Sequence, residues 1–591
     1  MPFLNLAAKI QLFTIGMSVN TIFLSFQATK RVFYSFVLSK ITNFAAWKIL
    51  TKSIHKTFYI MAETKYIFVT GGVASSLGKG VISSSIGKLL QARGYNVTIQ
   101  KFDPYININP GTLNPEEHGE CYVTVDGHEA DLDLGHYERF LGVNMTKANN
   151  ITTGRIYKRV IDRERRGEYH GKTIQVVPHI TDEIKRNVKA LGTKNQFDFI
   201  ITEIGGTVGD IESLPYMESV RQLKWELGRN ALCVHLTYVP YLAAAGELKT
   251  KPTQHSVQKL QSLGIQPDVL VLRTEHELPE GLKKKTALFC NVDSDAVFQS
   301  IDASTIYEVP VLLQNQGMDD TILRKFGITP GPKPALGPWR DFLDRRAKAT
   351  KEVHIGLVGK YDLQDAYKSI LEASSQAATY NNRKLKMHFL YSDNITADNV
   401  AESLKGMDGV IISPGAGQRG IEGKNIVANY TRVNNIPTFG ICLGMQCMVV
   451  EFARNVLGLA DANSREMNTT TPNNVVDIME EQKSHLSDTM RMGNFDCALI
   501  EGSKLKEIYG ANCIQERHHH RYEVNEKYKE QLESAGMKCT GINPDTKLVE
   551  AVEVEGHPWY IGVQYYPQYN STVLKPHPLF LSFIKAAIEK N

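Results

Sequence analysis

Residues 65–80 read KYIFVTGGVASSLGKG, and this stretch decides the fold class. An apolar run ends in two glycines and leads into a helical run, which predicts a strand, a tight turn and a helix. Backbone N–H groups at the start of such a helix can bind phosphate, and Lys79 can reach the same phosphate. The spacing departs from the standard phosphate loop, since Gly72 is one residue too far from Lys79 and Gly80 replaces the usual Ser or Thr. We therefore predict a variant phosphate loop whose magnesium ligand comes from elsewhere; the alternative is a tight strand–helix turn without a ligand.

Acidic side chains follow the next predicted strands. Asp103 ends one apolar run, Asp133 lies in the stretch DLDLGHYE (131–138), and Glu203 closes a third long run. Carboxylates at strand ends that face a phosphate loop can hold Mg²⁺ as hard oxygen ligands. Taken singly, each acid would more often cap a helix or lie in a solvated turn.

The alternation of apolar strand runs and helical runs continues along the chain. Further runs are NVTIQKFD (96–103), FDFIITEIGG (197–206), ALCVHLTYVP (231–240) and PDVLVLRT (267–274). Nearly continuous apolar strands separated by helical runs are typical of a parallel sheet with helices on both faces. We predict a doubly wound α/β domain over residues 61–327.

A change of composition marks the end of that domain. Residues 328–352 carry four prolines and then a run of charges, which is typical of a linker. The alternation restarts with VHIGLVGK (353–360), KMHFLYS (386–392), GVIISPG (409–415) and IPTFGICLG (436–444). We therefore predict a linker over 328–352 and a second doubly wound, parallel-sheet α/β domain over 353–591.

The charge balance and the cysteines exclude several classes of protein. Charged residues make up 22% of the chain, and Lys and Arg exceed Asp and Glu by only 67 to 63. This balance argues against an acidic tail or a surface that wraps nucleic acid. The eight cysteines form no CxxC pair and no short spacing typical of zinc or disulfide frameworks. We expect a reducing compartment, a cytoplasmic location and no nucleic-acid partner.

The first 60 residues differ from the rest, because they hold seven Lys or Arg residues and no Asp or Glu. Residues 10–29 are uncharged and fairly apolar, but polar residues interrupt them, so a membrane anchor there is marginal. A basic leader without acids is also typical of a presequence, which would make the location mitochondrial. The third interpretation is that Met61 is the working start and that residues 1–60 are dispensable.

A series of motifs in the first domain resembles the amidoligase domain of CTP synthases. In chain order they are GGVxSxLGKG (71–80), KFDPYIN (101–107), HGE (118–120), DLDLGHYERF (131–140), NNxTTGRIY (149–157), VPHIT (177–181), EIGGTVGDIESLP (203–215), GELKTKPTQHSV (246–257) and ALFCNV (287–292). The resemblance implies that ATP phosphorylates O4 of UTP, and that ammonia then displaces phosphate at C4 to give CTP. Phosphoryl transfer depends mostly on positioning and charge neutralisation, which a phosphate loop, lysines and acids can provide.

The resemblance also implies roles for individual residues. Lys79 and Lys101 would neutralise developing charge, while Asp133 and Glu203 would bind Mg²⁺. ATP and UTP would bind at Ser75, Ser76, Leu77, Gly78, Lys79, Gly80, Asp133 and Lys285. UTP, or CTP as feedback inhibitor, would bind at His118, Asp210, Ile211, Glu212, Lys249, Thr250, Lys251, Pro252, Thr253 and Gln254.

The second domain contains another sharp strand-to-helix turn. The stretch FGICLGMQ (439–446) places Cys442 at the end of an apolar strand, as in a nucleophile elbow, whereas a lone strand-end cysteine is usually buried packing. With Glu466 and RHHHRYEVN (517–525), this stretch resembles class I glutamine amidotransferases. The resemblance implies that Cys442 is the nucleophile, and that glutamine binds at Ala416, Leu443, Gly444, Met445, Gln446, Glu466 and Arg521.

The segment that should supply the partners of this cysteine departs from the family. Residues 564–569 read QYYPQY where the family has QFHPEF, so Tyr566 replaces the histidine base and Gln568 replaces the glutamate that orients it. A phenol with a pKa of about 10 is no base at neutral pH. Losing both base and orienter should cost on the order of 10³ or more in rate. His557 and His577 belong to other family motifs and do not replace them.

Other departures fall in the same site. The oxyanion loop PGAGQ (414–418) is one residue shorter than its family counterpart, and Ser487 and Asp488 replace two glycines. Residues 517–521 read RHHHR where the family has RHRHR. Because no acid or cysteine accompanies histidines 518–520, we interpret them as structural. These departures, beside intact synthetase motifs, predict a selective loss of glutaminase function.

Three hypotheses for the function follow. The first is a CTP synthase that takes ammonia from solution and keeps its second domain as a scaffold. The second retains weak glutaminase activity through Cys442 and a water or another base. The third is a non-catalytic paralogue that co-assembles with an active CTP synthase and regulates it. The family resemblance further implies a homotetramer that can also form filaments, with GTP as an allosteric activator; a membrane partner is not expected.

Overall fold

The structure is a computed structural model that describes residues 63–193, 196–478 and 490–590. The predictions for the N-terminal extension (1–60) and for Ser487 and Asp488 lie outside the described residues. Within the described ranges, no helix is long and apolar enough to cross a membrane. Residues Thr64–Asn591 cluster as one unit, which contains both of the large sheets.

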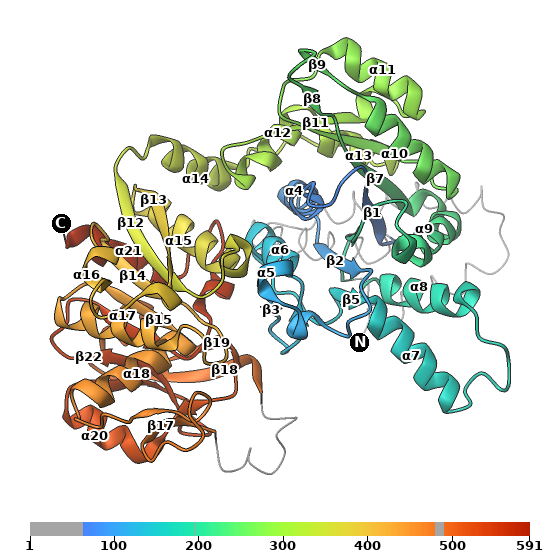
Figure 1. Cartoon of the computed structure of the whole chain (residues 1–591). Coiled ribbons are helices and arrows are strands. Elements are labelled where there is room, and N and C mark those ends of the chain that lie inside the picture. The colour runs from blue at the N-terminus through green and yellow to red at the C-terminus, as the bar shows by residue number, and fades with distance from the viewer. Residues whose placement is uncertain (1–62, 194–195, 479–489, 591) are drawn as a thin grey trace, which may run out of the picture. The chain divides into compact units, whose positions relative to one another are not determined.

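The first large sheet has seven strands, and all of its neighbouring strands are parallel (Figure 1). In spatial order they are β11 (Val297–Ile301), β10 (Val269–Thr274), β7 (Ala231–Tyr238), β1 (Lys65–Gly71), β6 (Phe199–Ile204), β2 (Val97–Asp103) and β5 (Asn150–Thr152). Every residue of β2 and β6 is buried, as expected for a parallel sheet covered on both faces. The predicted doubly wound α/β fold is confirmed.

Helices pack on both faces of this sheet. They are α4 (Lys79–Ala92), α5 (Pro115–His118), α6 (Asp133–Leu141), α7 (Thr153–Arg165), α8 (Thr181–Ala190), α9 (Leu214–Leu227), α10 (Lys251–Ser262), α11 (Glu280–Cys290), α12 (Val309–Asn315) and α13 (Met318–Lys325). Ile67 and Val69 of β1 join one core with residues of α4, while Tyr66 and Phe68 join a second core with residues of α9. The side chains of β1 therefore alternate between two buried layers. Two short hairpins complete this half: β3 (Tyr122–Val123) with β4 (Glu129–Ala130), and β8 (Tyr241–Leu242) with β9 (Glu247–Leu248).

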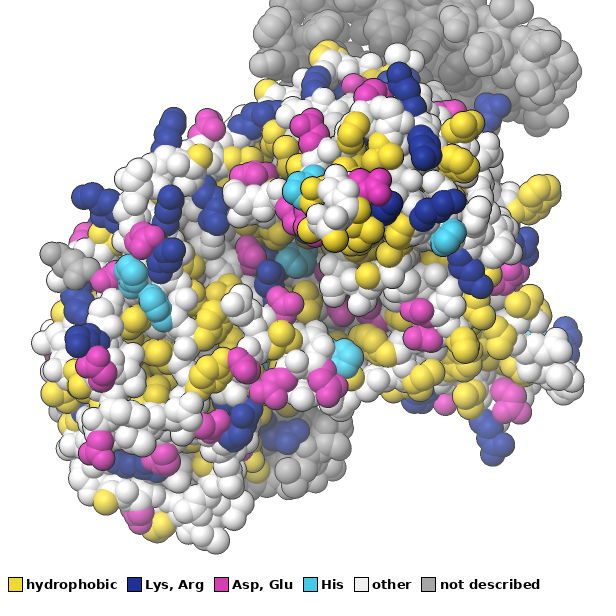
Figure 2. Space-filling view, turned by 45° about the horizontal axis from the view of Figure 1, so that its top comes forward, with side chains coloured by type: hydrophobic (Ala, Val, Ile, Leu, Met, Phe, Trp, Pro, Cys, Tyr) yellow, Lys and Arg dark blue, Asp and Glu magenta, His cyan; other side chains and the backbone are white. Residues whose placement is uncertain are grey.

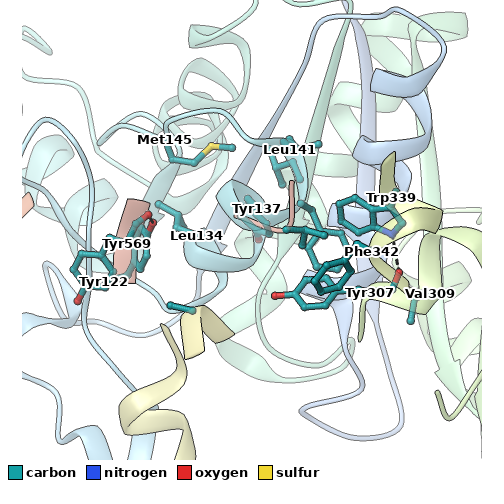
Figure 3. Close-up of a cluster of buried hydrophobic side chains, with 14 of the residues drawn as sticks. Tyr122, Leu134, Tyr137, Leu141, Met145, Tyr307, Val309, Trp339, Phe342 and Tyr569 are labelled. Carbon is teal, nitrogen blue, oxygen red and sulfur yellow. Dashed lines mark hydrogen bonds between the residues drawn. The ribbon is translucent and has the colours of Figure 1, made fainter. Parts of the chain in front are cut away.

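The proline-rich stretch 328–352 contains a helix, α14 (Gly337–Lys348), which the sequence did not predict. Its Pro338 lies in the first turn, where proline is tolerated because that N–H needs no helical partner. Trp339 and Phe342 are buried against Tyr307, and the Trp339 indole N–H donates to the Tyr307 carbonyl at 2.8 Å (Figure 3). This stretch therefore takes part in the core as well as connecting the two sheets.

The second large sheet has nine strands and is only partly parallel. Its parallel part is β13 (Lys384–Tyr391), β12 (Glu352–Gly359), β14 (Gly409–Ile412), β15 (Thr438–Ile441) and β23 (Tyr560–Val563). An antiparallel extension follows, made of β22 (Val549–Val554), β21 (Met537–Ile542), β18 (Arg491–Leu499) and β19 (Cys513–His520). The parallel part matches the sequence-based expectation, and the extension adds to it.

Helices also cover the second sheet. They are α15 (Lys368–Tyr380), α16 (Val400–Ser403), α17 (Ile421–Val433), α18 (Leu443–Asn455), α19 (Lys504–Tyr509), α20 (Lys529–Ser534) and α21 (Pro578–Glu589). A small sheet of β16 (Asn463–Ser464), β17 (Asn474–Asp477) and β20 (Glu523–Val524) lies beside α18. The face of the molecule shown in Figure 2 carries Lys and Arg interspersed with Asp and Glu, in keeping with the balanced composition.

Buried contacts join the two halves. Arg517 on β19 donates to the Glu138 carboxylate of α6 at 2.5 Å and to the Tyr122 hydroxyl at 2.8 Å. The rings of Tyr122 and Tyr569 lie 4.5 Å apart between centroids (Figure 3). Gly493 on β18 has a φ of 93°, and a Cβ there would lie 2.7 Å from the backbone nitrogen of Gly127. Only glycine permits this approach of β18 to the β3–β4 hairpin.

Candidate functional site

The predicted phosphate loop forms the turn between β1 and α4. Gly78, at the N-cap of α4, has a φ of 94°, and Ser75 and Ser76 are exposed. The Lys79 ammonium donates to the Gly206 carbonyl at 2.7 Å, and burial lowers the pKa of Lys79. Helix α10 closes on the loop, because a Cβ at Gly72 would lie 1.8 Å from the Ser256 hydroxyl oxygen. The predicted strand, turn and helix are confirmed.

A cluster of carboxylates surrounds Lys101 at the end of β2. The Lys101 ammonium contacts Asp133, lies 3.1 Å from Glu203 and 3.7 Å from Asp131, and is 4.0 Å from Asp103. Burial alone would lower the pKa of Lys101, but these acids raise it well above its usual range. Burial, with Asp131 beside it, raises the pKa of Asp103 to about 8. The strand ends thus bring together the acids that the sequence singled out.

The position of Gly80 follows from this cluster. A Cβ at Gly80 would lie 2.3 Å from a carboxylate oxygen of Asp133, so Asp133 fills the space beside the helix start. The carboxylates of Asp133 and Glu203 are hard oxygen donors that fit Mg²⁺, and both lie at the ammonium of Lys101. Gly80, which replaces the usual Ser or Thr, therefore leaves room for the Asp133 carboxylate.

The residues expected to bind the pyrimidine nucleotide lie on several elements. Asp210 accepts from the backbone N–H of Thr207 at 3.0 Å in the loop after β6, and the Thr253 and Thr237 hydroxyls are 3.0 Å apart. Lys249 pairs instead with Glu247 on the β8–β9 hairpin. Other residues of this group are exposed at the surface: Ile211, Glu212, Lys251 and Lys285. The His118 side chain is 46% exposed. His118 and Lys285 do not belong to the ion-pair cluster around Lys101.

Cys442 lies in a strained turn between β15 and α18. Its φ of 53° and ψ of −107° are unusual for a non-glycine residue, and its backbone N–H donates to the Val563 carbonyl at 2.7 Å. This geometry confirms the predicted elbow. Burial raises the pKa of the Cys442 thiol to about 12, although a hydrogen bond with Tyr566 acts in the opposite direction.

Tyr566 lies beside this thiol, and Gln568 lines the same cavity. The Tyr566 hydroxyl donates to the His519 carbonyl at 3.2 Å, and its ring stacks on Tyr569 with centroids 5.4 Å apart. Burial raises the pKa of Tyr566 well above its usual range. Gln568 is 2% exposed, and among the described residues its side-chain oxygen has no hydrogen-bond partner. Neither residue can take a proton from Cys442 at neutral pH.

A cavity of about 440 Å³ opens beside Cys442. The Glu466 carboxylate on its wall accepts from the Gly417 N–H at 2.8 Å, and Lys360 donates to the Ala416 carbonyl. Lys424 donates to the Ser413 carbonyl at 2.7 Å, and burial lowers the pKa of Lys424 to about 8. Of the residues expected to bind glutamine, the cavity walls include Ala416, Leu443, Gln446, Glu466 and Arg521. The buried residues Gly444 and Met445 lie in the same helix start.

The interpretation of histidines 518–520 as lacking acidic or cysteine companions is wrong. His519 lies 2.9 Å from Glu129, and Cys121 belongs to the same group of side chains. The His518 ring lies 3.4 Å from Glu550, and the His520 ring lies 3.4 Å from Glu523. Glu129 and Glu550 are remote in sequence, so local sequence could not reveal their contacts, whereas Glu523 lies three residues from His520 within the stretch 517–525.

Taken together, the fold and the site define a phosphate-loop ligase joined to a class I glutamine amidotransferase. A family model described as CTP synthase N-terminus matches residues 65–328, and one described as glutamine amidotransferase class-I matches residues 362–586. The CTP synthase of Bacteroides thetaiotaomicron is 73% identical over 535 residues, covering 90% of this chain and 100% of the relative. The CTP synthase of Porphyromonas gingivalis is 65% identical over 532 residues, covering 90% and 99%.

This chain therefore belongs to the CTP synthase family, and it is a carbon–nitrogen ligase with a glutamine amidotransferase domain. CTP synthases use ATP and UTP as substrates. Among solved structures, the glutaminase domain of Trypanosoma brucei CTPS with bound acivicin is 38% identical, with a TM-score of 0.39, and covers 40% of this chain and 95% of that one.

Proposed function

We propose that this chain makes CTP from UTP, ATP and free ammonia, and that its glutaminase half contributes little or nothing. The observation that carries the proposal is the pair of replacements beside Cys442. A buried tyrosine and a buried glutamine stand where a base and its orienter are needed. The second domain then remains as a folded partner of the synthetase half, to which Arg517 ties it.

The synthetase half supports the first part of the proposal. Lys79 would bind the phosphates at the start of α4, and Lys101 would neutralise charge on the transferring phosphoryl group. Asp133 and Glu203 would hold Mg²⁺, which neutralises phosphate charge when bound. We expect the phosphate-loop residues 75–80 to bind ATP and UTP, and the Asp210–Glu212 and Lys249–Gln254 stretches to bind the pyrimidine nucleotide.

The state of the Cys442 thiol supports the second part. With a pKa of about 12, only about one thiol in 10⁵ is ionised at pH 7. In a working triad, a histidine base removes this proton, and general-base catalysis contributes about 10²–10⁴ in rate. The histidines that line the cavity with Cys442 are engaged elsewhere, since His519 lies 2.9 Å from Glu129 and the His520 ring lies 3.4 Å from Glu523. His577, 2.8 Å from Glu516, and His557, 3.4 Å from the Thr431 carbonyl, do not line this cavity.

The choice of nitrogen source tests this proposal directly. CTP formation by the full chain is measured with ATP, UTP and Mg²⁺, using either ammonium chloride or glutamine with and without GTP. We expect product from ammonium and, with glutamine, a rate lower by about 10³. Equal rates from both sources would overturn the roles given to Tyr566 and Gln568. A Lys79→Gln variant controls for the synthetase site and should lose both activities.

The third hypothesis, a non-catalytic paralogue, predicts no CTP from either source. The ion pairs of Lys101 with Asp133 and Glu203, together with the exposed phosphate loop, weigh against it. A purely structural partner has no need of a buried lysine among four carboxylates, because burying charges costs free energy.

A further inference from the structure

Three chemically different side chains meet at the wall of the cavity beside Cys442. Cys121 immediately precedes β3, Glu129 begins β4, and His519 lies near the end of β19. One ligand atom from each (a thiol sulfur, a carboxylate oxygen and a ring nitrogen) lies within 4.8 Å of the other two. All three residues line the cavity. The proposed synthesis of CTP assigns no role to these three residues.

Their backbones and side chains are held in place from several sides. The Tyr569 hydroxyl donates to the Cys121 carbonyl at 3.0 Å, and the Tyr566 hydroxyl donates to the His519 carbonyl. The Glu129 carboxylate packs against Gly111, where a Cβ would lie 2.0 Å from a carboxylate oxygen. The side chain of Asn109 also hydrogen bonds to Glu129. The three donors therefore converge on a prearranged corner rather than on a flexible surface.

The donor set selects a class of ion. Thiolate, imidazole and carboxylate together are ligands of Zn²⁺ and its neighbours among the divalent transition metals, whereas Mg²⁺ and Ca²⁺ prefer oxygen donors alone. Tetrahedral bonds of about 2.0–2.3 Å place two ligand atoms about 3.3–3.8 Å apart. Ligand atoms that now lie up to 4.8 Å apart would therefore draw together by about 1 Å, while the His519 nitrogen and the Glu129 oxygen, now 2.9 Å apart, would separate slightly. The side chains of Glu129 and His519 are 15% and 18% exposed, so the corner is largely shielded but still reachable by an ion.

We propose that Cys121, Glu129 and His519 form a site for a divalent transition-metal ion of the Zn²⁺ type, with the fourth position open to the cavity beside Cys442. Cys121 would bind as thiolate, releasing its proton on metal binding. Three protein ligands with an open position can also hold a water or a small neutral ligand such as ammonia. The ion would join the β3–β4 hairpin of the synthetase half to β19 of the amidotransferase half.

The alternative is a plain hydrogen-bonded pair of His519 and Glu129 with a thiol close by. Metal content separates the two interpretations. The full chain, purified without chelator, is analysed for bound metal, then stripped with a chelator and titrated with Co²⁺ alone. We expect about one Co²⁺ per chain and a thiolate-to-cobalt charge-transfer band, which a histidine–carboxylate pair cannot produce.

Variants identify the ligands. Cys121→Ser should abolish the charge-transfer band, and Glu129→Gln or His519→Arg should weaken Co²⁺ binding by at least about tenfold to 100-fold, because even outer-shell partners contribute that much. His519→Arg restores the residue of the family pattern RHRHR, which makes misfolding of this variant a minor concern. Cys513→Ser, at an exposed cysteine on the same strand, is the matched control and should bind Co²⁺ as the parent does.

Circular dichroism of each stripped variant checks that the fold is intact. No bound Co²⁺ in the stripped parent, or binding that survives both Cys121→Ser and His519→Arg, would overturn the proposal. These measurements of metal binding do not depend on CTP synthesis. They therefore test the metal site even if the enzyme uses glutamine as well as ammonia.

Discussion

At the scale of single residues, the proton on Cys442 decides whether this chain can use glutamine. Burial raises the pKa of the thiol to about 12. At every pH below that value, the thiolate fraction should therefore increase about tenfold for each unit by which the pH is raised. We therefore expect the rate of Cys442 alkylation by iodoacetamide, followed by peptide mass spectrometry, to climb steadily from about pH 7 to pH 10. A plateau near neutral pH would reveal a stabilised thiolate and contradict this account.

The two replacements beside Cys442 predict the effect of reversing them. The double change Tyr566→His with Gln568→Glu should raise glutamine-dependent CTP formation by at least about tenfold, because a general base contributes about 10²–10⁴. Full recovery is not expected, since the oxyanion loop is also altered. Tyr566→Phe is the control, because it removes the hydroxyl but supplies no base. An equal gain in Tyr566→Phe would mean that the hydroxyl, rather than the missing base, limits the reaction.

At the scale of elements, the start of α4 depends on a glycine. Asp133 occupies the space where a Gly80 side chain would lie, at 2.3 Å from an added Cβ. Gly80→Ser should therefore displace the Asp133 carboxylate and lower ammonia-dependent CTP formation by about 10², the usual result of misplacing a catalytic group by about 1 Å. Gly281→Ala in α11, where a Cβ meets nothing within 4 Å, should leave the rate unchanged. Parent-like activity in Gly80→Ser would show that Asp133 has no role at this site.

The sequence predicted some elements better than others, for a physical reason. The runs that became β1, β6 and β7 are mostly apolar because helices cover both sheet faces, and such runs stand out in a sequence. The antiparallel strands β18 and β19 are partly exposed and rich in polar residues, so they gave no continuous apolar run. Helix α14 was missed because the three prolines before it and Pro338 in its first turn together suggested a linker, although Pro338 lies where helices accept proline.

At the scale of the whole molecule, contacts between distant segments were the part that the sequence could not predict. The motif at residues 564–569 showed that Tyr566 and Gln568 replace the expected histidine and glutamate, because the two residues are only two positions apart in the chain. His519 and Glu129 are 390 residues apart, and only the packing of β19 against the β3–β4 hairpin brings them to 2.9 Å. Local patterns carry no information about such pairings.

The same join between the halves makes a prediction about stability. Arg517 is fully buried and satisfies Glu138, which also accepts from the Met145 N–H at 2.7 Å. Arg517→Ala should destabilise the protein by about 3–5 kcal/mol, because it leaves a buried carboxylate without its cation. The double change Arg517→Met with Glu138→Leu should recover much of that loss, since apolar residues of similar size leave no unpaired charge.

Thermal unfolding of the full chain, followed by calorimetry, measures these changes against a surface control. Arg221 pairs with Glu218 on the exposed side of α9, so Arg221→Ala should change stability by less than about 1 kcal/mol. If Arg517→Ala melts with the parent, the buried pair does not hold the halves together. If Arg517→Ala melts earlier than the parent and the double variant recovers, the loss of stability comes from the unpaired charge of Glu138 rather than from the lost contact area.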